Sequence, residues 1–276
     1  MPDPIKTLTD EQLAARVKRE QELHDHGLDR RVIERLTRFL KNDTASQARD
    51  ALVREVIARG QHGIVVELGT KTWQHLVNFE HTPPRQLICM NIALAEVQRH
   101  SHRAIPPAHA HRIAFTVMDA HQIALPDQSA DVIYGIAILH HLDLAASIRE
   151  IDRVLKPGGS AVFVEPLRDN PLLKLIRAVT PQARTPDELP FSHPELAHFA
   201  EYFHVEYHYS QLLSVPAAVL SGLLLGSSDT PLVRATHRLD QATAAHLPAL
   251  QTWFRIVTLV LHKPPSPNAK GGAADG

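Results

Sequence analysis

The sequence predicts an α/β protein with a doubly wound, mostly parallel seven-stranded sheet behind an N-terminal helical cap. From residue 64 onward, short runs of β-branched and other apolar residues alternate with segments of helical periodicity. Strands separated by helices are joined by right-handed crossovers within one sheet. The first sixty residues show only the apolar spacing typical of helices.

Residues 1–60 are expected to form the cap. Thr9 or Asp10 can begin a first helix, a second is expected over residues 32–40, and a third over residues 48–57. Because all three precede the first apolar run of strand type, we assign this stretch to a unit of its own.

The sheet region is expected to span residues 61–264. Strands are expected at residues 64–68, 87–90, 112–117, 130–135, 161–164, 205–209 and 254–261, and helices near residues 73–78, 93–102, 144–155 and 230–247. The turn Pro157-Gly158-Gly159 is expected to lead into the fifth strand. A helix separates the last two strands, so we expect an antiparallel edge and not a simple hairpin.

Three segments depart from this alternation. Residues 167–200 are rich in proline and are interpreted as an insertion over the strand ends, and residues 265–276 as a disordered tail. The apolar run Val215 to Gly226 is far shorter than the roughly twenty residues of a bilayer span. It is expected to be a buried or cap element.

Composition excludes several classes of partner. With 29 basic and 30 acidic residues, the chain lacks the concentrated positive charge that nucleic acid or an anionic membrane requires. No apolar signal segment is visible at the N-terminus, and the lone Cys89 has no partner for an internal disulfide, so a cytoplasmic location is expected. The nineteen histidines come without an HExxH or paired CxxC arrangement, and no metal site is predicted.

Polar motifs gather where the predicted strands end. They are Asp119-Ala120, Leu139-His140-His141-Leu142, and Leu155-Lys-Pro-Gly-Gly159 with Glu165-Pro166. In this order and spacing, residues 63–264 resemble class I S-adenosylmethionine-dependent methyltransferases that act on small molecules. The resemblance implies a Rossmann-like methyltransferase fold, S-adenosylmethionine as cofactor, and Arg19 to Asp25 as part of a cap over it.

The resemblance also implies a set of cofactor-binding residues. Asp119 would accept the adenine amino hydrogen while the Ala120 amide meets a ring nitrogen; a turn cap is the alternative role for Asp119. Glu67 would hold the loop and the methionine amino group, or would only be satisfied by neighbouring amides. The full set is Glu67, Gly69, Thr70, Asn91, Ile92, Asp119, Ala120 and Gly135.

The chain departs from the family pattern at three positions. The loop Glu-x-Gly-x-Gly-x-Gly carries Lys71 and Trp73 in place of its second and third glycines. Either Trp73 packs as the first residue of a helix or the slot is partly filled; we favour the packed tryptophan and a solvated Lys71. Asn91 replaces the acid that chelates the ribose hydroxyls, at an expected cost of about 1–2 kcal/mol in binding.

The candidate catalytic residues are His140, Tyr134 and Glu165. Methyl transfer needs a positioned nucleophile and sometimes a base, and a histidine suits that role. The alternative is that the paired histidines cap a helix and line the pocket. For the whole protein, the alternative to methyl transfer is a protein of the same fold that binds a ligand, supports a partner subunit or catalyses a rearrangement. The sequence leaves the oligomeric state open, with a homodimer as one option, and predicts a fairly apolar small acceptor.

Overall fold

The computed structural model describes residues 8–26, 42–102, 105, 107–170, 174 and 190–266. Seven strands form one sheet: β1 (Ile64–Leu68), β2 (Gln86–Asn91), β3 (Ile113–Val117), β4 (Ala130–Ile136), β5 (Leu155–Pro166), β6 (His204–Ser210) and β7 (Ile256–His262). The α-helices are α1 (Asp10–His26), α3 (Asp43–Ala58), α4 (Trp73–Leu76), α5 (Leu94–Ser101), α6 (Pro107–Ala110), α7 (Leu144–Val154), α9 (His193–Leu196), α10 (Ser214–Leu225) and α11 (Pro231–His246). Short 3₁₀ helices are η1 (Leu139–His141), η3 (Ala197–Glu201) and η4 (Pro248–Trp253).

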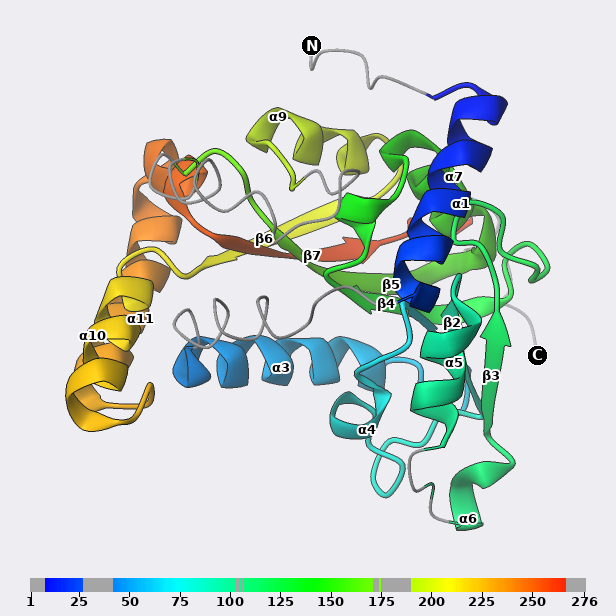
Figure 1. Cartoon of the computed structure of the whole chain (residues 1–276), viewed down its shortest axis with the longest axis horizontal. Helices are drawn as coiled ribbons and strands as arrows, with labels where there is room; N and C mark the ends of the chain where they lie inside the picture. Colours follow the sequence, from blue (N-terminus) through cyan, green and yellow to red (C-terminus); the bar gives the residue numbers. More distant parts are fainter. Residues whose placement is uncertain are drawn as a thin grey trace, which may run out of the picture.

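The strand order is β3-β2-β1-β4-β5-β7-β6, and only β7 runs antiparallel to its neighbours (Figure 1). The predicted seven-stranded, mostly parallel sheet is therefore confirmed, as is its antiparallel edge. The chain leaves β1 toward β2 on one side and returns to β4 on the other. In open α/β sheets, ligands bind at the carboxyl ends of the strands beside such a switch point.

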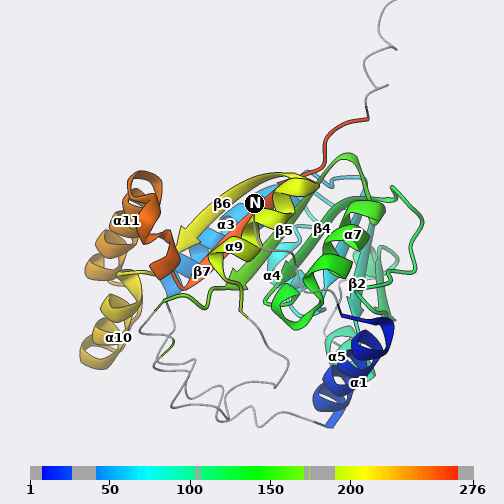
Figure 2. The same cartoon turned by 90° about the horizontal axis from the view of Figure 1, so that it is seen from above.

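Helices cover both faces of the sheet. Helix α3 lies on one face, and α7 and α9 lie on the other (Figures 1 and 2). The sheet has a hydrophobic core on each face. On the α3 face, Val53 and Val56 pack with Val65 of β1, and on the opposite face Ile148 and Ile151 of α7 belong to a separate core. Because successive strand side chains point to opposite faces, neighbouring residues of one strand serve different cores.

Two of the three helices predicted before the sheet are found among the described residues, and the later one, α3, packs on the sheet instead of forming part of a separate cap. Helix α1 begins at the expected place, and the Thr9 hydroxyl accepts from the Gln12 amide. Helix α3 corresponds to the third predicted helix and is capped by the side chain of Asn42. The second predicted helix, over residues 32–40, lies outside the described residues.

Two predicted features were wrong in detail. Strand β5 begins at Leu155, so Pro157-Gly158-Gly159 lies within the strand, where Gly158 has φ +78°. The apolar run after Val215 forms α10, and of its two predicted alternatives, a buried or a cap element, the buried one is wrong, because Leu223 and Leu224 are 67% and 72% exposed. Small residues on one side of α10, not these leucines, are the buried ones. No helix among the described residues has the length and apolar character to cross a membrane.

Candidate functional site

The candidate site lies at the carboxyl edge of the sheet, beside the switch point between β1 and β4. The loop after β1 begins there with Gly69, whose φ of +73° is a conformation that glycine adopts without a steric cost. Asn91 ends β2, Asp119 follows β3, and Glu165 lies near the end of β5. The residues predicted for a cofactor thus come from neighbouring strand ends.

Glu67 holds the loop that follows β1. Its Oε1 accepts from the amides of Lys71 and Thr72 at 3.1 and 2.7 Å and from the Thr72 hydroxyl at 2.7 Å. Its side chain is buried, in register with Cys89 of β2 and Tyr134 of β4. The role of Glu67 in holding the loop is therefore visible. The second predicted role, toward a methionine amino group, stays a prediction.

Trp73 does not occupy the space over the loop. It is the first residue of α4, only 3% exposed, and its ring meets Phe115 edge to face with centroids 5.9 Å apart. The packed position predicted for Trp73 is confirmed, and Lys71 is exposed as expected.

The loop also carries a polar group that suits a ligand. The Thr70 hydroxyl is fully buried and has no hydrogen-bond partner among the described residues, while the Thr70 amide donates to the Met90 carbonyl. A buried hydroxyl without a partner costs free energy unless something else satisfies it. Together with the acceptors Asn91 and Asp119 on the next strands, this loop fits the polar groups of S-adenosylmethionine.

Asn91 forms a local turn at the end of β2. Its Oδ1 accepts from the Ala93 amide at 3.0 Å, which leads the chain into α5. Ile92 is partly buried between them. An aspartate could make the same turn, because the contact uses only an acceptor oxygen.

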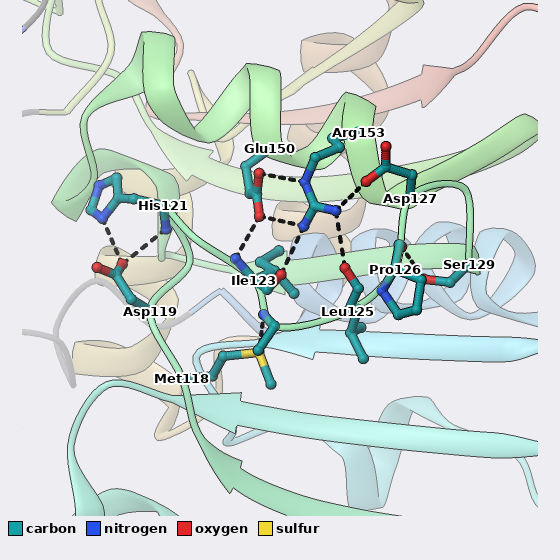
Figure 3. Close-up of polar contacts among 11 residues, drawn as sticks. Met118, Asp119, His121, Ile123, Leu125, Pro126, Asp127, Ser129, Glu150 and Arg153 are labelled. Carbon is teal, nitrogen blue, oxygen red and sulfur yellow. Dashed lines mark hydrogen bonds and ion pairs between the residues drawn. The ribbon is translucent and has the colours of Figure 1, made fainter.

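Asp119 is tied to a residue that the sequence analysis missed (Figure 3). Its Oδ1 accepts from the His121 amide at 2.9 Å and from the His121 ring Nδ1 at 2.7 Å. Burial alone would raise the pKa of the Asp119 carboxyl, but the hydrogen bonds from His121 outweigh it and lower that pKa. Of the two predicted roles, the turn contact is present, and it uses one oxygen. Ala120, next in the chain, is buried.

A brace from α7 holds the segment after β3. Glu150 Oε1 accepts from the Ile123 amide at 2.6 Å, and Arg153 donates to the Ile123 and Leu125 carbonyls at 2.7 and 3.0 Å (Figure 3). Arg153 also pairs with Glu150 and Asp127. The only sequence signal for this brace was the Glu-x-x-Arg spacing on a predicted helix.

The buried side chain of Glu165, on β5, holds the turn that follows β4. It has no exposed surface, its Oε1 accepts from the amides of Ile138 and Leu139 at 3.1 and 2.9 Å, and its Oε2 lies 2.6 Å from His140 Nδ1. Glu165 therefore acts through His140 and the turn, and the structure gives it no surface for direct contact with an acceptor.

The structure separates Tyr134 from this pair. Tyr134 is fully buried on the α3 face of the sheet, whereas Glu165 and its neighbour Val257 belong to the α7 face. Burial and the charge of Glu67 raise the pKa of Tyr134 well above its ordinary value. The Tyr134 side chain is fully buried and lies beside Glu67 and Thr72 at the base of the loop after β1, so its predicted catalytic role stays a prediction.

Gly135 and Gly69 both leave room for Ile138. A Cβ built on Gly135 would come within 2.6 Å of Ile138 Cγ2, and one on Gly69 within 3.1 Å of Ile138 Cδ1. The two glycines thus let the turn after β4 fold back onto the end of β1. Gly135 shapes the site through this packing.

Helix α1 lies over the same edge (Figure 2). Its Glu20 is buried with Oε2 3.6 Å from His141 Nδ1. The amide of Leu8 donates to Asp143 Oδ2 at 3.1 Å, and Asp143 is the N-cap of α7. The predicted position of the cap, next to the cofactor residues, is consistent with these contacts. Within the described part of the chain, no three His, Cys, Asp or Glu side chains are grouped for a metal ion.

Comparison with known proteins gives one family. Residues 66–163 match the methyltransferase domain family. The chain is 32% identical over 131 residues to a dimethylglycine N-methyltransferase of Parasynechococcus marenigrum, covering 46% of each chain. It is 37% identical over 71 residues to a 27-O-demethylrifamycin SV methyltransferase of Amycolatopsis mediterranei, covering 25% of this chain and 26% of the other. The matches span less than half the length of these curated relatives.

Solved structures share the fold. The [4+2]-cyclase SpnF superimposes with a TM-score of 0.51 at 20% identity, covering 78% of this chain and 81% of that one. A geranyl diphosphate C-methyltransferase from Streptomyces coelicolor, solved with S-adenosyl-L-homocysteine, gives 0.52 at 13% identity and covers 77% and 78%. At these identities the likeness concerns the fold alone.

Proposed function

We propose that this chain, whose residues 66–163 match the methyltransferase domain family, is a class I S-adenosylmethionine-dependent methyltransferase that methylates a small-molecule acceptor. The observation that carries the proposal is the convergence of Thr70, Asn91 and Asp119 at three neighbouring strand ends beside the switch point. An unpartnered buried hydroxyl and two acceptor side chains are the groups that an amino acid joined to a nucleoside needs.

Each residue has a distinct task in this proposal. When bound, S-adenosylmethionine supplies an electrophilic methyl group on a sulfonium. Asn91 meets the ribose hydroxyls, and Asp119 with the Ala120 amide meets the adenine. The Glu67-braced loop, with Gly69 and Thr70, holds the methionine end.

His140 is the proposed base for the acceptor. Its Nδ1 lies 2.6 Å from Oε2 of the buried Glu165, so the carboxylate fixes the orientation of the ring. A histidine held in one orientation can take a proton at a defined place, which is what general-base catalysis requires. The acceptor is proposed to be small and fairly apolar, as the apolar residues that follow β6 in the sequence led us to expect.

The test is calorimetric titration with S-adenosylmethionine and with S-adenosyl-L-homocysteine. Binding of both in the micromolar range supports the proposal. No heat of binding near millimolar concentration overturns it. A methyl-transfer assay against a panel of small acceptors, with and without His140→Gln, then tests the base.

A second candidate function keeps the cofactor site and loses transfer. It is favoured by Asn91, which stands in place of the acid that chelates the ribose hydroxyls in the family pattern. In that case the protein binds S-adenosyl-L-homocysteine yet transfers no methyl group to any acceptor that it binds. Both candidate functions therefore predict cofactor binding in the calorimetric titration. Only the first predicts methyl transfer in the acceptor assay.

We also propose a cytoplasmic setting. Cys89 is buried and free, and burial raises the pKa of its thiol well above the ordinary value. A buried protonated thiol is an unreactive one. The proposal is tested by fractionating cells that express the full chain.

A further inference from the structure

We infer that His121 is a positioning residue that holds Oδ1 of Asp119 and so reserves the second oxygen, Oδ2, for the 6-amino group of adenine. The inference rests on the proposed function and goes beyond it, because it assigns the selectivity for adenine to a residue outside the motif. His121 is not part of the Asp119-Ala120 pair on which the family resemblance depends.

The contacts of His121 fix its tautomer. The amide of Asp143 donates to His121 Nε2 at 2.9 Å, so Nε2 must present a lone pair. The ring proton is therefore on Nδ1, which lies 2.7 Å from Asp119 Oδ1 and donates to it. The ring is only 4% exposed, whereas the Asp119 side chain is 32% exposed. The buried histidine is the fixed partner, and the carboxylate is the group that a ligand can reach.

Hydrogen bonds connect the segment around His121 to α7 and its N-cap residue. Asp143 Oδ1 accepts from the Ala146 amide at 2.8 Å as the N-cap of α7. Further along the same helix, Glu150 holds the Ile123 amide, two residues after His121. The short segment from Asp119 to Ile123 is thus tied to α7 at two points. Figure 3 shows the Asp119–His121 contact and the Glu150 brace on either side of this segment.

The hydrogen bonds also keep the carboxylate charged. The His121 ring and backbone donate to the same oxygen and lower the pKa of Asp119 despite its partial burial. Oδ2 makes none of the contacts drawn in Figure 3. A charged oxygen in a fixed orientation accepts strongly from an amino group, and it repels a base that presents an acceptor at the same position. This arrangement would favour adenine over hypoxanthine.

The experiment compares two probes on four proteins by calorimetry. The probes are S-adenosyl-L-homocysteine and its analogue with hydrogen in place of the 6-amino group. The proteins are the wild type, His121→Asn, His121→Gln and the control His111→Gln, which changes an exposed histidine at the opposite end of β3. Asparagine keeps a donor where Nδ1 stands, and glutamine keeps an acceptor where Nε2 stands.

The wild type and the control should prefer the 6-amino probe by about tenfold or more. His121→Asn should keep most of this preference, and His121→Gln should reduce it to about twofold, because only the first variant still donates to Asp119. Thermal unfolding of each variant separates a folding defect from a binding effect. A general weakening that leaves the ratio unchanged would mark His121 as structural only and overturn the inference.

The outcomes also separate this inference from the proposed function. If the wild type binds neither probe, the proposed function fails and the inference falls with it. If the wild type binds both but does not distinguish them, the cofactor site stands and the positioning role is wrong. Equal ratios in His121→Asn and His121→Gln would likewise overturn the role of the Nδ1 donor.

Discussion

Oε2 of Glu165 lies 2.6 Å from Nδ1 of His140, and the carboxylate that makes this contact has no exposed surface. The same side chain accepts from the amides of Ile138 and Leu139. One buried charge on β5 thus fixes both the turn after β4 and the ring that the turn carries. The stability of the turn and the orientation of the proposed base, His140, therefore both depend on the Glu165 side chain.

Glu165→Gln should destabilise the fold. The substitution keeps the shape but replaces a charged acceptor by a neutral one, and hydrogen bonds to charged groups are the stronger by about 1 kcal/mol each. We expect the free energy of unfolding to fall by about 1–3 kcal/mol in urea titrations. Glu80→Gln is the matched control, because Glu80 is exposed, and it should change stability by less than about 0.5 kcal/mol. Equal behaviour of the two variants would contradict the buried-acceptor role.

Asn91→Asp should tighten cofactor binding. The aspartate can keep the turn to the Ala93 amide and adds a charged acceptor for the ribose hydroxyls. The expected gain is about tenfold in the Kd of S-adenosyl-L-homocysteine, measured by calorimetry. Asn78→Asp is the control: Asn78 makes a similar turn, to Glu80 and His81, in an exposed loop. An unchanged Kd in Asn91→Asp would show that residue 91 does not face the ribose.

Trp73→Gly should not improve cofactor binding, although it restores a family glycine. The indole is packed against Phe115 in the α3-side core, and its removal leaves a cavity. Loss of a buried tryptophan costs about 3–5 kcal/mol, and glycine at a helix start adds backbone freedom to the unfolded chain. Trp253→Gly, at a site 48% exposed, should cost much less. Stability unchanged at Trp73, or a tighter Kd, would contradict the packed position.

Acid should destabilise the protein through His237 of α11. The side chain is 7% exposed, and its ring nitrogens have no hydrogen-bond partner among the described residues. Burial lowers the pKa of His237, and the charge of Asp240 offsets this only in part. The unfolded chain therefore binds the proton at higher pH than the folded chain does. The free energy of unfolding decreases as the pH falls below about 6.5, the ordinary pKa of a histidine. It becomes constant again below the lower pKa that His237 has in the folded protein.

Urea midpoints at pH 8 and pH 5 measure this effect. The drop between the two should be smaller in His237→Phe than in the wild type. His246→Gln, an exposed histidine on the same helix, should reproduce the drop of the wild type. A drop that is the same in all three proteins would assign the pH dependence to other groups.

The elements of the sheet could be predicted because local patterns and global fold agree there. β1 was predicted at its observed bounds, since a short β-branched run between polar turns has no competing structure. The start of β5 could not be predicted, because Pro157-Gly158-Gly159 is locally a turn, and only pairing with β4 and β7 extends it into a strand. The exposed leucines of α10 escaped prediction because apolarity alone does not reveal burial.

The site was predictable as a set of positions and less so as a set of roles. Asp119, Asn91 and the loop after β1 come together because strand ends share an edge. The burial of Tyr134 beside Glu67, on the face opposite Glu165, depends on which face β4 turns to α3, and a run apolar on both faces does not encode that choice. His121 was missed although Asp119 is only two residues away, because its orientation also depends on the Asp143 amide, 22 residues along the chain, and a contact of that range leaves no local signal.

The reversed direction of β7 has a practical consequence. The chain runs along β7 from Ile256, which pairs with Pro166 near the site edge, to His262, which pairs with Ser160 farther back. Seven residues of strand span about 23 Å. A fluorophore, affinity handle or surface tether joined after Lys263 is therefore attached at the edge of the sheet opposite the candidate site. The titrations above can then be run on immobilised protein with the candidate site facing away from the support.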